Sequence, residues 1–192
     1  MHEFVLPICN PPIIQTTSDY ADMFTILPLH SDFQNWLGTH YSNLVYLHTP
    51  DENYQINFCS EIYTDCELLD YDIHNSEMSM SEDEIGIDNV VDYIKELISK
   101  KYYAIVETNQ YNIPGTSYYR KIQYMHRQLF YGYSDIDKCF YTLGYNKQRK
   151  YRSLAIPYEE IPKATIEYDI KLAAPIHTIK LNNNSYDFDK HK

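Results

Sequence analysis

The chain has 192 residues, with 44% hydrophobic and 22% charged residues, which excludes a disordered chain and fits one folded domain. Its formal net charge of −11 repels phosphate groups, so neither nucleic acid nor an anionic membrane surface is expected as a partner. No apolar run is long enough to span a bilayer and the N-terminus lacks the basic residues of a signal peptide, so a cytoplasmic location is expected.

Two helices and a hairpin are predicted in the first sixty residues. Polar residues at 16–19 cap a short helix with apolar residues at helical spacing, and Pro28 ends it. Ser31 caps a second helix, whose apolar stripe runs from Phe33 to Leu44. Two short strands then flank the polar turn 50–53.

The strongest helical pattern follows an acidic stretch that ends near residue 90. Asp88 is the expected N-cap. The predicted buried stripe consists of Val90, Val91, Ile94, Leu97 and Ile98. Its members recur at the spacing of one face of a helix.

The second half of the chain is dominated by strand patterns. The predicted strands are 102–107, 126–133, 138–145, 151–157 and 174–182, with a short helical turn at 158–164. Short connections between most of them predict an antiparallel meander. With the helices gathered in the first half, the predicted fold class is α+β.

More specific patterns lie in this second half, at 102–114 (YYAIVETNQYNIP), 124–146 (YMHRQLFYGYSDIDKCFYTLGYN) and 158–164 (YEEIPKA). Together they resemble the BtrH-type N-terminal family of butirosin biosynthesis. That family is papain-like and occurs in thiotemplate and nonribosomal biosynthetic clusters. The resemblance covers roughly residues 100–165 well and the first 60 residues weakly. It implies one papain-like domain over 1–192, with a mainly helical half (1–100), an antiparallel sheet half (101–181) and a tail (182–192).

The resemblance also implies a catalytic site. His126 falls on the family's catalytic histidine, and Asn146 falls where such enzymes keep the residue that orients it. Active members carry the nucleophilic cysteine at the start of the first core helix, where this chain has no cysteine at 17–20. Cys9, upstream of that helix, is then the preferred thiol, and Asp135 is a rival orienting residue.

Each of these residues also has an ordinary structural interpretation. His126 fits a core histidine, Cys9 a small buried hydrophobe, Asn146 a turn residue and Asp135 a hairpin-loop residue. The four cysteines are too few for a disulfide scaffold, and their spacing is not that of a zinc site. There is no glycine-rich phosphate loop, so no nucleotide is expected. Neither a metal nor another cofactor is expected.

The sequence and the resemblance are compatible with three functions. The first is a papain-like acyltransferase, in which Cys9 takes an acyl group from a carrier-bound thioester and His126 and Asn146 support its transfer to an amine. Its partners would be an acyl or peptidyl carrier protein and an amine acceptor. The second is a non-catalytic relative that binds a peptide, carrier protein or small molecule at a surface with Tyr111, Tyr118 and Tyr119. The third is a cysteine peptidase or amide hydrolase that uses water.

Overall fold

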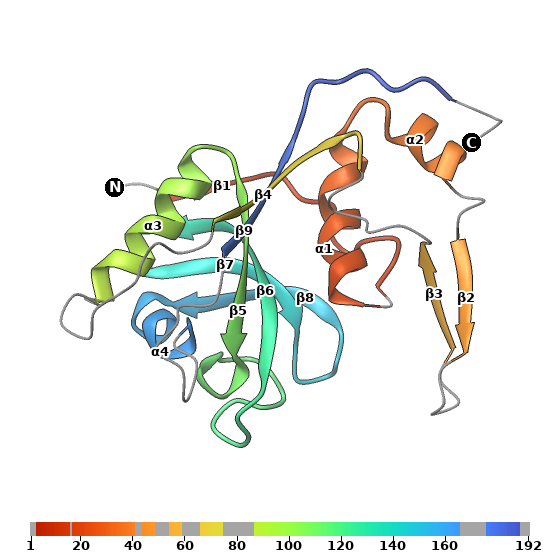
Figure 1. Ribbon diagram of the computed structural model, residues 1–192. Helices are drawn as coiled ribbons and strands as arrows, with labels where there is room; N and C mark the ends of the chain where they lie inside the picture. The colour runs from red at the N-terminus through yellow and green to blue at the C-terminus, as the bar shows by residue number, and fades with distance from the viewer. Residues whose placement is uncertain are drawn as a thin grey trace. The chain divides into compact units, whose positions relative to one another are not determined.

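A computed structural model describes residues 3–15, 17–40, 44–48, 54–58, 66–74, 87–165 and 176–188 (Figure 1). The fold class is α+β, as the sequence predicts, with a seven-stranded sheet and several helices. The chain divides into two compact units. Unit 1 comprises Met1–Pro7 and Asp72–Lys180, and unit 2 comprises Ile8–Tyr71 and Leu181–Lys192. The expectation of one papain-like domain stays a prediction.

The sheet has the strand order β4-β9-β5-β6-β7-β8, and β1 also pairs with β6. Its strands are β1 (Glu3–Val5), β4 (Leu69–His74), β5 (Tyr103–Asn109), β6 (Met125–Ser134), β7 (Cys139–Tyr145), β8 (Tyr151–Pro157) and β9 (Ile176–Leu181). The antiparallel meander predicted from the sequence is confirmed for β5 to β8. The sequence did not predict β1 and β4 as strands.

Strand β6 is the centre of unit 1, because three strands pair with it. β5 pairs with its first half, β7 with its second half, and β1 pairs with it through Val5 and Gly132. A β-bulge lies between Phe130 and Gly132. A Cβ atom at Gly132 would lie 2.9 Å from the backbone oxygen of Phe4. Glycine at this position therefore allows β1 to approach β6 closely.

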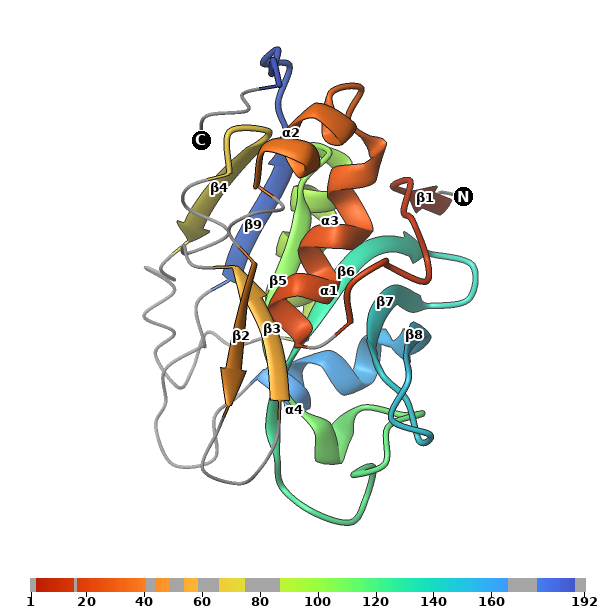
Figure 2. The same cartoon turned by 90° about the vertical axis from the view of Figure 1, so that its right-hand side faces the viewer.

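Helices α3 (Ile87–Ser99) and α4 (Ile161–Thr165) lie on one face of the sheet in unit 1 (Figures 1 and 2). The predicted apolar stripe of α3 is buried, as expected. The predicted cap is wrong, because α3 begins at Ile87 and Asp88 lies inside it. At its other end Lys101 has a φ of 68° and the Tyr102 N–H donates to the Leu97 oxygen at 3.0 Å. This pattern is a Schellman motif, which satisfies the last carbonyl groups of a helix.

Unit 2 contains α1 (Ser18–Ile26), the 3₁₀ turn η1 (Leu27–Leu29), α2 (Phe33–His40) and the antiparallel hairpin β2 (Leu44–His48) and β3 (Tyr54–Phe58). The two helices and the hairpin agree with the sequence patterns. The second predicted helix was too long, because α2 ends at His40 and Leu44 begins β2. Phe24 holds the two helices together through edge contacts with Phe33 and Trp36, at ring-centroid distances of 6.2 and 6.4 Å.

Candidate functional site

His126 is the second residue of β6, where the strand pairs with Thr108 of β5. Its ring is partly exposed, and its Nδ1 atom lies 3.1 Å from the carbonyl oxygen of Arg127. A carbonyl oxygen can only accept, so this contact places a proton on Nδ1. In the neutral ring Nε2 then carries the lone pair, which is the form that a general base needs.

Aromatic side chains flank this ring on two sides and form a row at one end of the sheet. The Tyr124 ring centroid lies 5.8 Å from that of His126, and Tyr118 continues the row at 4.6 Å from Tyr124. On the other side Tyr145 meets His126 edge-on at 5.7 Å, and Tyr151 meets Tyr145 at 5.5 Å. The row fixes the position of the imidazole through ring contacts.

Asn146 follows β7 directly and shapes the turn into β8. Its Oδ1 atom accepts the backbone N–H groups of Gln148 and Lys150, at 2.9 and 3.1 Å. Its own N–H donates to the Lys150 oxygen at 3.0 Å. Within the described residues no hydrogen bond joins Asn146 to His126. The group that contacts Nδ1 of His126, where an orienting residue would bind, is the Arg127 carbonyl oxygen. These contacts match the turn interpretation of Asn146.

Cys9 lies in unit 2 and is partly exposed. Its backbone N–H donates to the oxygen of Thr25 at 2.9 Å, in the last turn of α1. This is the carbonyl end of the helix, which offers no free N–H groups to an anion. Since His126 belongs to unit 1, the pairing of Cys9 with His126 stays a prediction.

The other described thiols have poor surroundings for a nucleophile. Burial raises the pKa of Cys66 to about 12, and it also raises the pKa of Cys139. Cys139 pairs with Ser134, eight residues along β6 from His126, or about 26 Å at the usual rise per residue of a strand. Cys59 lies outside the described residues.

Asp135 lies just beyond the other end of β6 and is bound to different groups. Its Oδ1 atom accepts hydrogen bonds from Lys95 Nζ at 2.7 Å and from Tyr158 Oη at 3.1 Å. The hydrogen bond from Lys95 is the main cause that lowers the pKa of Asp135. Burial, and then the charge of Asp135, raise the pKa of Tyr158. Asp135 thus joins α3 to the β6–β7 turn, which does not support its role as an orienting residue for His126.

Asp135→Asn is expected to lower the free energy of unfolding by about 1 kcal/mol at pH 7. The folded-state pKa of Asp135 is lowered, so its stabilising effect is present above the unfolded-state pKa of about 3.9. That effect is lost as the pH falls through the lower folded-state pKa. Urea unfolding of both proteins at pH 7, 5, 4 and 3 measures the difference, and a constant difference over this range would contradict the assignment.

Tyr111, Tyr118 and Tyr119 lie in the loop between β5 and β6 and are partly exposed. Arg120 orders this loop: its guanidinium lies over the rings of Tyr111 and Tyr119, at 5.5 and 5.1 Å from their centroids. The Nη2 atom of Arg120 also donates to both carboxylate oxygens of the buried Glu160, at 2.9 and 3.0 Å. The tyrosine surface is therefore held in place before any ligand arrives.

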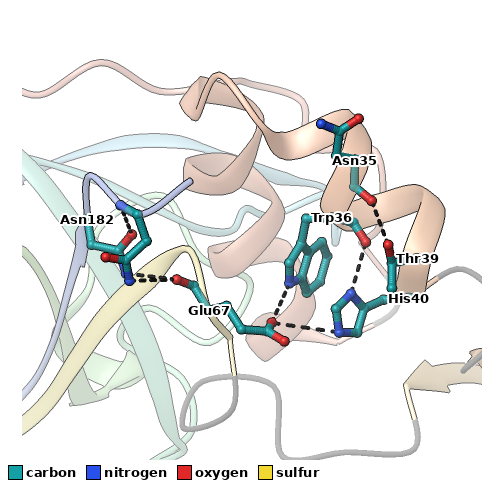
Figure 3. A network of polar contacts seen from close by, with 7 residues as sticks. Asn35, Trp36, Thr39, His40, Glu67 and Asn182 are labelled. Atoms are coloured by element: carbon teal, nitrogen blue, oxygen red, sulfur yellow. Dashed lines mark hydrogen bonds and ion pairs between the residues drawn. The ribbon is translucent and has the colours of Figure 1, made fainter. Parts of the chain in front are cut away.

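Unit 2 contains a polar network that sequence reasoning missed (Figure 3). Trp36 Nε1 donates to Glu67 Oε2 at 3.0 Å, and His40 Nε2 lies 3.7 Å from the same oxygen. His40 Nδ1 contacts the Trp36 oxygen at 2.9 Å, and Asn182 donates to the Glu67 carbonyl at 2.9 Å. Glu67 and Asn182 lie far along the chain from Trp36 and His40, so no short motif predicts the network. His40 is only 9% exposed, and its contacts are those of a structural histidine.

A polar hollow of about 400 Å³ lies in the same unit, between residues 29–32 and 181–185. His30 Nδ1 accepts the N–H of Asp32 at 3.0 Å, and Asp32 Oδ2 accepts the N–H of Tyr186 at 2.9 Å. The side chains of His30 and Asp32 are thus already hydrogen-bonded within the protein, and the residues that line the hollow do not indicate one class of ligand.

The part of the chain that the structure describes contains no group of three or more His, Cys, Asp or Glu residues able to hold a metal ion. None of its helices is long and apolar enough to cross a membrane.

Neither the models of known protein families nor the curated proteins include a match to this chain. The likeness to the BtrH-type family therefore remains a proposal that rests on the sequence patterns at 102–114, 124–146 and 158–164.

Proposed function

We propose that the chain is a non-catalytic, papain-like relative of the BtrH-type family and acts by binding. The observation that carries this proposal is the start of α1. The resemblance expects a nucleophilic cysteine there, but the residues are Thr17 and Ser18, and the Thr17 hydroxyl accepts the Tyr20 N–H at 3.5 Å as the helix cap. The nearest cysteine in sequence, Cys9, contacts the opposite end of the helix.

The tyrosine loop is the binding surface in this proposal. Tyrosines offer large contact areas with few rotatable bonds, so ordering them on binding costs little entropy. Arg120 and Glu160 already fix Tyr111 and Tyr119, which lowers that cost further.

An acyltransferase is the second candidate, and the geometry of His126 favours it. With Nδ1 held by the Arg127 carbonyl, Nε2 is free to accept a proton from a thiol. The thiolate of Cys9 would attack a thioester carbonyl, release the carrier thiol and hold the acyl group until an amine displaces it. If Cys9 instead attacked an amide carbonyl, released the amine and passed the acyl group to water, the same residues would make the chain a peptidase or amide hydrolase.

Labelling by a limiting thioester acyl probe at pH 7 separates these candidates. The binding proposal expects slow labelling of wild-type Cys9 that does not change in His126→Ala. Ser18→Cys places a thiol in the first turn of α1, where helix N–H groups stabilise a thiolate. We expect residue 18 of this variant to react about tenfold faster than Cys9 of the wild type. Lowering the pKa of a thiol by one unit raises its thiolate fraction at pH 7 by about that factor.

Intact-mass spectrometry with peptide mapping reads out the modified cysteine. Selective, rapid acylation of wild-type Cys9 that disappears in His126→Ala would overturn the non-catalytic proposal and favour the acyltransferase. Buried Cys66 serves as an internal control that stays unlabelled while the protein is folded.

A further inference from the structure

Basic and acidic residues are distributed very unevenly along this acidic chain. All 16 Lys and Arg residues lie at or after Lys95, so the first 94 residues contain none. Residues 108–134 and 138–158 contain three and five Lys or Arg, respectively, and no Asp or Glu. These stretches include β6, β7 and β8, so this part of unit 1 is locally positive although the whole chain has a net charge of −11.

The structure gathers four of these cations at one end of the sheet. Lys147, Arg149 and Lys150 lie in the turn between β7 and β8, and Lys121 lies in the loop between β5 and β6. Lys147 donates its backbone N–H to the oxygen of Gly115 at 2.9 Å, which joins the turn to that loop. We call Lys121, Lys147, Arg149 and Lys150 the basic tip.

All four side chains of the basic tip are exposed. Among the described residues no carboxylate pairs with any of them, whereas Lys95, Lys100 and Arg120 all have acidic partners. The turn is also ordered, since Asn146 Oδ1 binds two of its N–H groups. A fixed group of unpaired cations attracts an anionic partner at distances within the screening length of about 8 Å.

The neighbouring tyrosines indicate which anionic partner fits. Single-stranded nucleic acid needs free aromatic faces on which bases stack. Here the rings of Tyr118 and Tyr124 lie 4.6 Å apart, and Arg120 covers faces of Tyr111 and Tyr119. Each of these rings thus already has one contact over its surface within the protein, whereas the four cations of the basic tip have no carboxylate partner among the described residues and would attract carboxylates.

Strand β8 adds a backbone feature beside these cations. It follows the basic turn directly and is the last strand in the order of the sheet, with β7 as its one partner among the described strands. Ser153 and Ala155 in its middle are exposed. A strand edge of this kind pairs with an extended peptide through main-chain hydrogen bonds.

We infer that the basic tip and the edge of β8 dock an extended, acidic polypeptide segment of a partner protein. This inference rests on the proposed binding function and names its class of partner. The carboxylates of the segment would face the basic tip while its backbone extends the sheet.

Fluorescence anisotropy with a fluorescein-labelled 16-residue peptide rich in Glu and Asp tests the inference on the full chain. The test variant is Lys147→Glu/Arg149→Glu/Lys150→Glu. The matched control is Lys100→Glu/Lys101→Glu/Lys138→Glu, which changes the net charge by the same amount at exposed positions outside the basic tip. We expect saturable binding to wild type, at least about tenfold weaker binding to the test variant, and less than about threefold weakening in the control.

Equal weakening in both variants, or no saturable binding of the acidic peptide, would overturn the inference. Tighter binding of a uridine oligonucleotide or of phosphatidylserine vesicles than of the peptide would overturn the choice of a polypeptide. Thiol labelling tests the non-catalytic proposal separately from the peptide-binding inference. A reactive Cys9 in a chain whose basic tip binds the peptide would overturn only the non-catalytic proposal. An unreactive Cys9 in a chain that does not bind the peptide would overturn only the inference.

Discussion

Phe130→Ala is expected to lower the free energy of unfolding by about 3–5 kcal/mol, the usual cost of removing a fully buried aromatic ring. Phe130 has no exposed surface and lies in β6, the strand with three partners. Its ring meets Phe140 of β7 edge-to-face at 5.3 Å, and Phe140 in turn contacts Tyr158 at 4.9 Å. Alanine would leave a cavity between these elements.

Urea unfolding followed by circular dichroism measures the effect of Phe130→Ala. Ile122→Ala is the control, because Ile122 is 59% exposed and its truncation should change stability by less than about 0.5 kcal/mol. Similar stabilities for the two variants would contradict the position of Phe130 in the core of unit 1.

Gly132→Val is expected to cost roughly 2–3 kcal/mol, in the range for overpacking a close contact. The added side chain would meet the backbone of β1, since a Cβ atom at Gly132 lies 2.9 Å from the Phe4 oxygen and 3.1 Å from the Val5 Cα. The easiest relief is for β1 to leave β6. The Leu6 N–H, which donates to the Tyr131 oxygen at 2.8 Å, would then lose its partner.

Hydrogen exchange distinguishes this local effect from a general loss of stability. In Gly132→Val the amides of residues 3–6 should exchange much faster, while those of β5 follow the global stability. Gly38→Val is the matched control, because its new Cβ would meet only the Phe188 side chain. Unchanged exchange of residues 3–6 in Gly132→Val would show that the strand adapts without losing β1.

Local sequence patterns predicted the helices and strands whose formation depends on residues close together in the sequence. The meander β5 to β8 follows from short connections between strand-like runs, and α3 follows from one apolar stripe that is in fact buried. Strand β1 was missed because its pairing is set by residues far along the chain, as the partners Val5 and Gly132 illustrate. Three residues beside a proline-rich segment contain no periodic signal of their own.

The candidate site was harder to predict, because its details depend on long-range contacts and on backbone groups. The contact between the Arg127 carbonyl and Nδ1 of His126 could not be predicted from the sequence, since every residue has a backbone carbonyl group. Asn146 had two interpretations, and only the turn contacts of its Oδ1 atom separate them. The pairing of Cys9 with His126 depends on how two units are placed, which no short motif encodes.

The interleaving of the two units has a consequence for protein synthesis. During synthesis β1 is made more than a hundred residues before β6, so it has no partner in β6 until that strand has been made. The Glu67 carbonyl likewise cannot accept its hydrogen bond from Asn182 until that residue has been made. Neither unit can therefore close as a nascent segment of consecutive residues, and the slow, non-local pairings form last. We expect the growing chain to expose the future core around Phe130 until late, a stage at which chaperones would protect it from aggregation.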